Sequence, residues 1–269
     1  MTEQIVVQLN PDVPPTGSDL GVVNAARKSF GRRSEWEFES HGARGKTVQI
    51  LKEKDKRLLE FLARGMTADD FEDFLYNFEG DVPKDYKSQL TELLWQWRNT
   101  PTHDTPFNHG FFSFEVKAPI FVARHLVKHE YLIMSEYSRR YITDDVEFYQ
   151  PNWRGKAEDV KQGSGGELPT LLGKGCNIKV GVANGMAMEL YEDLITNSGV
   201  APEQARMVLP QSLMTSWTWS GSFGAFANMC KLRLSKDTQY ETRMVAEKVY
   251  EELKKQFPIS APLLVEGVV

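Results

Sequence analysis

The C-terminal half of the chain carries one helical pattern after another, and this feature most constrains the fold. Apolar residues recur with helical spacing in four segments, at about 181–198, 201–209, 220–234 and 237–257. Alternating, strand-like patterns are few, and the clearest are Q-I-V-V-Q-L at 4–9 and F-F-S-F-E-V-K-A at 111–118. The sequence therefore predicts a helix-rich fold with few strands.

The N-terminal half continues this pattern with shorter segments. Further helices are predicted at 18–31, with Ser18 or Asp19 as N-cap, and at 52–65, 67–78 and 84–99. The charged or glycine-rich stretches 32–48 and 152–180 are predicted to be loops. The aromatic run W-T-W at 217–219 is typical of a core or a subunit interface.

One amphipathic segment, 119–134, concentrates polar chemistry on an apolar frame. Pro119 suits the first position of a helix, so the segment is predicted to be helical. At the helical repeat, Arg124, His125, Lys128 and His129 fall within about 140° of arc. These four side chains would therefore share one face.

Length and composition bound the class of protein. The chain has 269 residues and a formal net charge of −5, so its overall field would repel nucleic acid. Cys176 and Cys230 form no C-x-x-C pair, which favours a reduced cytoplasmic setting over a disulfide framework. No apolar run is long enough to span a membrane, and the N-terminus does not resemble a signal peptide. We expect a cytoplasmic protein without nucleic-acid or membrane partners.

The two histidines of this segment leave three readings open. His125 and His129 have the spacing of helical metal ligands, but Leu126 stands where H-E-x-x-H requires glutamate. We therefore expect no metal. Two half-buried structural histidines, or an anion or cofactor site that also uses Arg124 and Lys128, remain open.

Other arginines are placed to bind an anion. Ser138 and Arg140 are two residues apart and follow the segment 119–134, and together they can bind one phosphate. Arg206 and Arg233 are flanked by apolar residues, and an arginine on a buried face usually has an anionic partner. The three arginines suggest convergence on an anion, and the alternative is that Arg206 and Arg233 form structural pairs with Asp or Glu.

Five segments, in order along the chain, resemble the flavin-dependent thymidylate synthase family. They are N-A-A-R-K-S-F (24–30), the stretch from H-D-T-P-F-N-H to V-A-R-H (103–125), S-E-Y-S-R-R-Y (135–141), S-G-V-A-P-E-Q-A-R-M-V-L-P (198–210) and N-M-C-K-L-R-L (228–234). Residues 31–102 look expanded relative to the family, with extra helices. The resemblance implies one α+β domain over 1–269, helix-rich with a small antiparallel sheet and assembled as a homotetramer.

The resemblance also implies a reaction. It is the reductive methylation of dUMP at C5, with methylenetetrahydrofolate as carbon donor, FAD as hydride carrier and NADPH as reductant. Active sites would be shared between subunits. The same resemblance leaves two alternatives: C5-hydroxymethylation or methylation of another pyrimidine nucleotide, and a non-catalytic nucleotide-binding protein.

Individual roles follow from the same match. Ser138, Arg140 and Arg206 would bind phosphate, and the catalytic Arg233 would stabilise the ionised uracil. The other positions expected to bind substrate are His125, Lys128, Glu136, Tyr137 and Arg139. The positions expected to bind flavin are Thr105, Lys128, His129, Glu130, Glu136 and Asn228.

The chain departs from the family pattern at several of these places. The family's R-H-R is Lys128, His129 and Glu130 here, so one guanidinium fork is lost and one charge is reversed. Asn108 replaces a glutamate and His125 a glutamine. A family N-x-R that helps hold FAD reads Ser222-Phe223-Gly224.

Overall fold

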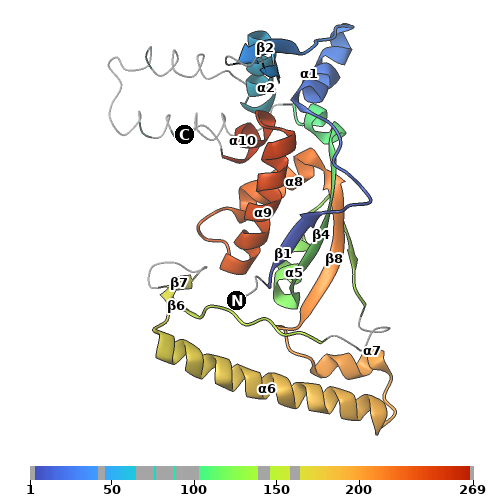
Figure 1. Ribbon diagram of the computed structural model, residues 1–269, viewed down its shortest axis with the longest axis vertical. Coiled ribbons are helices and arrows are strands. Elements are labelled where there is room, and N and C mark those ends of the chain that lie inside the picture. Colours follow the sequence, from blue (N-terminus) through green and yellow to red (C-terminus); the bar gives the residue numbers. More distant parts are fainter. Residues whose placement is uncertain are drawn as a thin grey trace. The chain divides into compact units, whose positions relative to one another are not determined.

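The structure, a computed structural model, is α+β with more helix than strand (Figure 1). It describes residues 4–41, 46–64, 103–138, 146–157 and 164–266, together with Tyr76, Ser88 and Glu92. The strands are β1 (Val6–Leu9), β2 (Glu37–His41), β3 (Lys46–Ile50), β4 (Phe111–Pro119), β5 (Leu132–Glu136), β6 (Arg154–Lys156), β7 (Ser164–Glu167) and β8 (Met214–Ser222). The α-helices are α1 (Asp19–Arg27), α2 (Glu53–Arg64), α5 (Ile120–Leu126), α6 (Thr170–Thr196), α7 (Pro202–Ala205), α8 (Phe223–Arg233), α9 (Tyr240–Gln256) and α10 (Ser260–Val265). Three 3-10 turns complete the described elements: η1 (Lys28–Phe30), η2 (Thr105–His109) and η3 (Arg206–Val208).

The chain divides into two compact units, and neither is continuous in sequence. The sheet unit comprises Met1–Asn10, Ser113–Ser220 and Leu232–Lys248. The helical unit comprises Pro11–Phe112, Gly221–Lys231 and Val249–Val269. The predicted helix-rich α+β class with small antiparallel sheets is confirmed, while the single domain over 1–269 stays a prediction.

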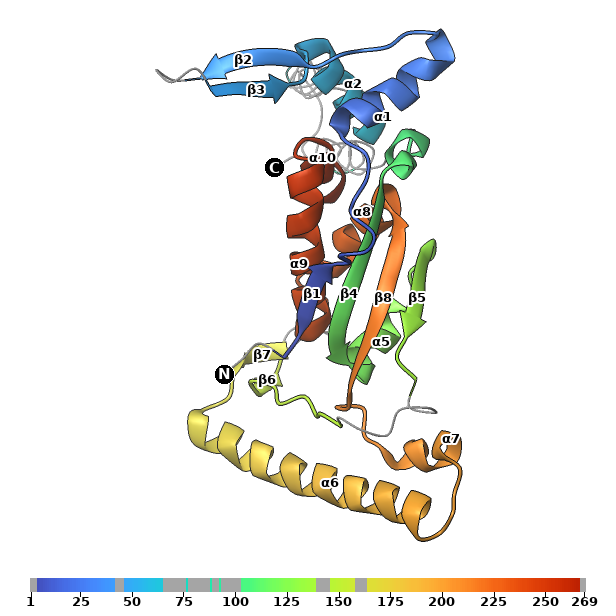
Figure 2. The same ribbon diagram turned by 45° about the vertical axis from the view of Figure 1, so that its right-hand side comes forward.

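The sheet unit is built on four strands in the order β1-β4-β8-β5, which Figure 2 shows side by side. β1 pairs antiparallel with β4, with Val6 opposite Lys117 and Leu9 opposite Phe114. On β8 burial alternates as a half-buried strand requires, and Trp217 and Trp219 are both at most 1% exposed. The W-T-W run is therefore core, as predicted, but the strand that carries it was missed.

The predicted helix at 119–134 is wrong beyond Leu126. α5 begins after Pro119 and ends at Leu126, and the chain then turns through Tyr131, whose φ is +63°. Residues Leu132–Glu136 form the strand β5 beside β8, and the Tyr137 amide donates to the Ser216 carbonyl at 2.8 Å. Backbone pairing with β8 thus overrides the local helical pattern, which cannot report a distant partner.

Both predicted loops also contain strands. Within 32–48, β2 pairs antiparallel with β3, and within 152–180, β6 pairs with β7 before α6 begins at Thr170. The helices predicted at 67–78 and 84–99 fall almost wholly outside the described residues; Tyr76, Ser88 and Glu92 are helical. Among the described helices none is long and apolar enough to cross a membrane.

The helical unit packs around an aromatic cluster. Phe112, Phe223 and Phe257 are fully buried, and the rings of Phe223 and Phe257 stack with centroids 4.0 Å apart. Ser18 caps α1 as predicted, because its Oγ accepts from the Gly21 amide at 3.2 Å. The buried carboxylate of Asp55 on α2 pairs with Arg27 of α1.

Candidate functional site

Arg233 is the last residue of α8 and belongs to the sheet unit, where two histidines of the segment after β4 hold it. Its Nε donates to Nε2 of His129 at 2.8 Å, and Nη2 donates to the His125 carbonyl at 3.4 Å. Nε2 must be unprotonated to accept, so His129 carries its proton on Nδ1. The structure thus brings Arg233 to the two histidines that were predicted to share one face.

Burial and nearby positive charge keep the imidazoles of His125 and His129 neutral. Burial, and then the nearby Arg233 charge, lower the pKa of His129 to about 4. Burial, Arg233 and Lys128 also lower the pKa of His125, whose Nδ1 is hydrogen-bonded to the buried Thr242 hydroxyl at 3.1 Å. Positive charge at this site therefore rests on Arg233 and Lys128 at neutral pH.

His125, Lys128 and Arg233 line an open pocket of about 820 Å³. Arg154 of β6 and Tyr240 and Glu241 at the start of α9 also line this pocket. The predicted shared face of two cations and two histidines is only partly present, because the helix ends at Leu126 and neither Arg124 nor His129 lines the pocket.

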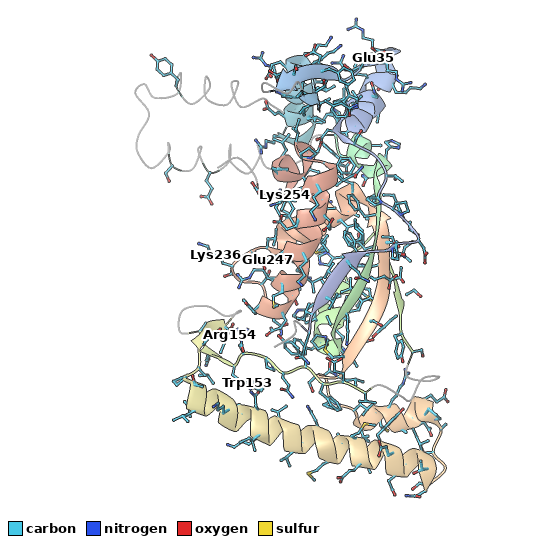
Figure 3. All side chains as sticks on the ribbon, viewed as in Figure 1. Glu35, Trp153, Arg154, Lys236, Glu247 and Lys254 are labelled. Atoms are coloured by element: carbon cyan, nitrogen blue, oxygen red, sulfur yellow. The ribbon has the colours of Figure 1, made fainter. Side chains whose placement is uncertain are left out.

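Arg154 lines this pocket, although the sequence did not suggest it as a site residue. It pairs with the nearly buried Glu241 at 2.6 Å, donates from Nε to Ser164 Oγ at 2.7 Å and lies 4.1 Å from the Tyr240 ring centroid. Figure 3 labels Arg154 beside Trp153, whose Nε1 donates to Asn177 of α6 at 2.7 Å. Burial, and after it the negative charge of Glu241, raises the pKa of the Tyr149 hydroxyl to about 12. No local sequence pattern marks Arg154 and Glu241 as partners, since the two residues are far apart along the chain.

A second pocket of about 360 Å³ holds the predicted phosphate-binding residues that the structure describes. Glu136, Tyr137 and Ser138 from the end of β5 line it together with Arg206 and Thr215. Thr215 Oγ1 donates to Glu136 Oε1 at 2.9 Å, which orients that carboxylate. Arg139 and Arg140, both predicted to bind substrate, lie outside the described residues.

Arg206 is exposed in the turn η3, so its placement on a buried helical face was wrong. Its Nε donates to the Glu203 carbonyl at 3.2 Å. Within the described part of the chain neither Arg206 nor Arg233 forms an ion pair with a carboxylate. Arg206 and Arg233 line different pockets of one chain, so the expected convergence of the arginines is not seen within it.

The remaining predicted positions are solvent-accessible. Thr105 on η2 and Asn228 on α8 are exposed in the helical unit. Lys128 and Glu130 are exposed in the sheet unit. Among the described residues no group of three His, Cys, Asp or Glu could hold a metal ion.

Two departures from the family pattern meet in space. Ser222 Oγ donates to Asn108 Oδ1 at 2.6 Å, and a Cβ added at Gly224 would lie 2.5 Å from the same oxygen. A side chain at position 224 would therefore displace the amide of Asn108. The residues at positions 108, 222 and 224 therefore pack directly against one another.

The family model described as "Thymidylate synthase complementing protein" matches residues 14–259. The chain belongs to this family. The family membership expected from the five segments is therefore confirmed.

Two curated relatives are named "Flavin-dependent thymidylate synthase". The protein from Thermus thermophilus is 36% identical over 159 residues, or 59% of this chain and 57% of the relative. The protein from Ehrlichia ruminantium (strain Gardel) is 33% identical over 168 residues, or 61% of this chain and 56% of the relative. The chain thus spans little more than half of these relatives' length.

A solved structure covers much more of the chain. The UMP/dUMP methylase PolB from Streptomyces cacaoi, bound with 5-Br dUMP, superposes with a TM-score of 0.69 at 25% identity. The match covers 97% of this chain and 95% of that chain.

Proposed function

We propose that this protein methylates a pyrimidine nucleotide at C5 and converts dUMP to dTMP. One observation carries the proposal: Arg233, fixed by His129 and by the His125 carbonyl, presents a positive charge to an open pocket. The similarity to flavin-dependent thymidylate synthases and to the UMP/dUMP methylase PolB supports a nucleotide substrate and a methyl product.

Arg233 would act on the base. A guanidinium at the uracil edge stabilises negative charge that develops on the ring, so that C5 attacks the carbon donor without a protein nucleophile. The neutral His129 accepts from Nε and leaves other guanidinium hydrogens for the base. The carbon unit would come from methylenetetrahydrofolate.

The phosphate would be bound separately from the base. Ser138 and Arg206 offer a hydroxyl and a guanidinium to the smaller pocket, and Arg140 belongs to the same proposal. Glu136, oriented by Thr215, would accept from a ribose hydroxyl. These groups bind and orient the nucleotide without taking part in bond formation.

The donor set fits a flavin. Thr105 and Asn228 present a hydroxyl and an amide group in the helical unit, and such groups pair with the hydroxyls and phosphates of a dinucleotide. In the sheet unit the proposed flavin residues are Lys128, His129, Glu130 and Glu136. FAD held there would supply the hydride that completes the methyl group, with NADPH as its reductant.

Self-association would complete the active site. α6 is 27 residues long and exposes apolar side chains along its length, with Leu171 85%, Ile178 69% and Met186 66% exposed. Isolated surface apolar residues are ordinary, but a continuous set on one helix indicates a partner surface. We propose that α6 packs against other copies in a homotetramer, in which Arg233 of one copy and Arg206 of another reach one nucleotide.

A second nucleotide substrate is also supported. PolB is a methylase of both UMP and dUMP, so UMP is the alternative substrate, and C5-hydroxymethylation is the alternative outcome. The test incubates purified protein with FAD, NADPH, methylenetetrahydrofolate and either dUMP or UMP. Mass spectrometry then separates methylated from hydroxymethylated products.

We expect flavin absorbance bands in the protein and dTMP from dUMP. Flavin bands without any product, or nucleotide binding without flavin bands, would replace the proposal by a non-catalytic nucleotide-binding role.

A further inference from the structure

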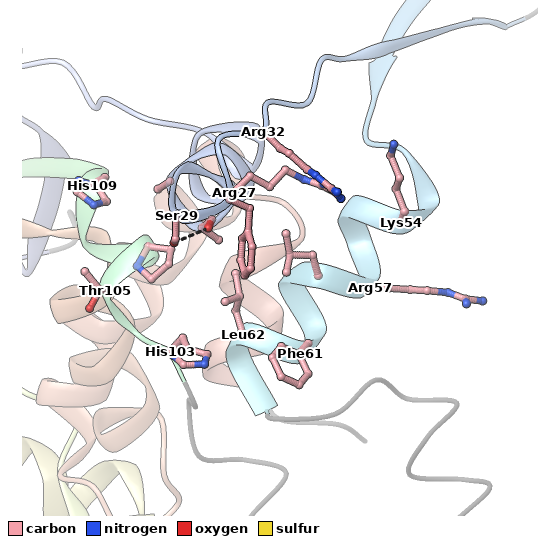
Figure 4. Close-up of a pocket in the computed structure, with 15 residues that line it drawn as sticks. Arg27, Ser29, Arg32, Lys54, Arg57, Phe61, Leu62, His103, Thr105 and His109 are labelled. Atoms are coloured by element: carbon pink, nitrogen blue, oxygen red, sulfur yellow. Dashed lines mark hydrogen bonds between the residues drawn. The ribbon is translucent and has the colours of Figure 1, made fainter.

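One hydrogen bond beside the Arg233 pocket has no role in the proposed function. His125 of α5 lines this pocket, and its Nδ1 lies 3.1 Å from the hydroxyl oxygen of Thr242 on α9. All three residues belong to the sheet unit. A pocket of about 790 Å³ in the helical unit, shown in Figure 4, is lined by the proposed flavin residue Thr105 and belongs to the flavin proposal.

The bond between Thr242 and His125 has a definite direction. Thr242 is fully buried, and among the described residues the partner of its hydroxyl is Nδ1 of His125. A buried hydroxyl that donates to no acceptor costs free energy, so Thr242 donates and Nδ1 accepts. The proton of the neutral imidazole is therefore on Nε2.

The same bond also fixes the orientation of the ring. Burial, and then the charges of Arg233 and Lys128, lower the pKa of His125, so the ring is neutral at neutral pH. A half turn about the Cβ–Cγ bond would exchange Nε2 with Cε1 and would break the bond to Thr242. Thr242 thus determines both which nitrogen carries the proton and where that N–H group lies.

The imidazole and the guanidinium are neighbouring donors. Arg233 Nη2 donates to the His125 carbonyl at 3.4 Å, and both side chains line the pocket. Uracil has acceptors at O2 and O4, on the two sides of N3, whereas cytosine has an amino donor in place of O4. Two neighbouring donors therefore match both carbonyls of uracil but only one end of cytosine.

We propose that Thr242 is a positioning residue that holds Nε2–H of His125 as a donor to O4 of uracil, so that the pocket selects uracil over cytosine nucleotides. This assignment rests on the proposed function, which puts the base beside Arg233. A fixed donor rejects an analogue that brings a second donor, because both groups then remain unpaired. The glutamine of the family pattern at position 125 could offer either a donor or an acceptor by turning its amide.

The test variant is Thr242→Val, which keeps the shape of the side chain and removes the hydroxyl, while Thr242→Ser retains the hydroxyl. The matched control is Thr218→Val in the same unit, since Thr218 donates to Glu115 at 2.8 Å and does not line the pocket. Calorimetry with added FAD measures the dissociation constants of dUMP and dCMP for each full-length protein. Thermal unfolding shows whether each variant keeps the fold.

We expect the wild-type protein, Thr218→Val and Thr242→Ser to bind dUMP about 10- to 100-fold more tightly than dCMP, the effect of one unmade hydrogen bond at a buried site. In Thr242→Val the preference should fall below about threefold, because the ring can turn and lose its bond to O4. A purely structural role of Thr242 would lower stability without changing this preference.

A second measurement needs no change at position 242. In wild-type protein labelled with nitrogen-15 histidine, NMR distinguishes protonated from unprotonated ring nitrogens, and loss of the signal in His125→Gln assigns it. We expect a protonated Nε2 and an unprotonated Nδ1 for His125. A protonated Nδ1 would overturn the proposal, whether or not Thr242→Val folds.

Two binding results would also overturn it. An unchanged preference in a folded Thr242→Val would remove Thr242 from base selection, and equal losses of dUMP and dCMP affinity would show that His125 does not contact O4. Binding and turnover are measured separately. A protein that prefers dUMP through Thr242 but forms no dTMP would refute the proposed function and leave base selection assigned, and dTMP formation with equal affinities for dUMP and dCMP would do the reverse.

Discussion

Replacing His129 by alanine removes the acceptor that fixes Arg233 and leaves the guanidinium in place. The Nε–Nε2 distance of 2.8 Å describes a hydrogen bond from a charged donor. Such bonds are worth about 1.5–3 kcal/mol. If the bond positions Arg233 for the transition state, this energy appears in the barrier, and turnover at saturating dUMP should fall about 10- to 150-fold.

A matched variant separates positioning from packing. His129→Gln retains an acceptor oxygen at the end of a side chain of comparable reach, so it should recover much of the lost rate. Single-turnover reactions measure the chemical step, and the dUMP dissociation constant should change much less than the rate. Flavin absorbance in each variant controls for the separate proposal that His129 contacts FAD.

Two outcomes would refute this reasoning. Unchanged turnover in His129→Ala would show that Arg233 needs no such support. Equal losses in the alanine and glutamine variants, with flavin content preserved, would show that the imidazole acts otherwise than as an acceptor.

Four further predictions concern Arg206, Arg233, the titration of His129 and the exposed face of α6. Arg206→Ala should weaken dUMP binding by about 1.5–3 kcal/mol and leave deoxyuridine binding nearly unchanged; equal losses in calorimetry would contradict the phosphate assignment. Arg233→Lys keeps the charge but loses the planar fork, so turnover at saturating dUMP should fall about 10²–10³-fold, whereas a pure affinity loss would make Arg233 a binding residue. The pKa of His129 is about 4 in the folded state and about 6.5 unfolded, so the unfolded state binds more protons and stability should fall as pH drops from 6.5 to 4; urea unfolding of His129→Gln should show a weaker pH dependence in this window. Ile178→Lys with Met186→Lys should lower the assembled mass measured by light scattering, and an unchanged mass would remove α6 from the interface.

Much of the local structure could be predicted from the sequence. α1 begins at the predicted Ser18 cap, α2 at 53–64 and α9 at 240–256 match their helical patterns, and the alternation at 111–118 is β4. These features depend on side chains within a few residues of one another, so the local sequence pattern is enough to predict them.

The sequence could not predict which segments become strands through distant pairing. β5 and β8 are neighbours in the sheet although about eighty positions separate them, and the pattern at 119–134 satisfied a helix equally well. The hairpins β2–β3 and β6–β7 also lacked a clear alternating pattern. Backbone pairing decides such segments, and periodicity within one segment does not report it.

By itself the sequence determined the family, through five short segments in order, and the residue types that an anion-binding site requires. Only the tertiary structure decided which of those residues contact one another. It placed His129 as an acceptor for Arg233 and put Arg206 in a different pocket. It also paired Arg154 with Glu241. The physical reason is that a hydrogen bond or an ion pair depends on distances of a few ångströms, and between segments far apart along the chain the fold alone sets those distances.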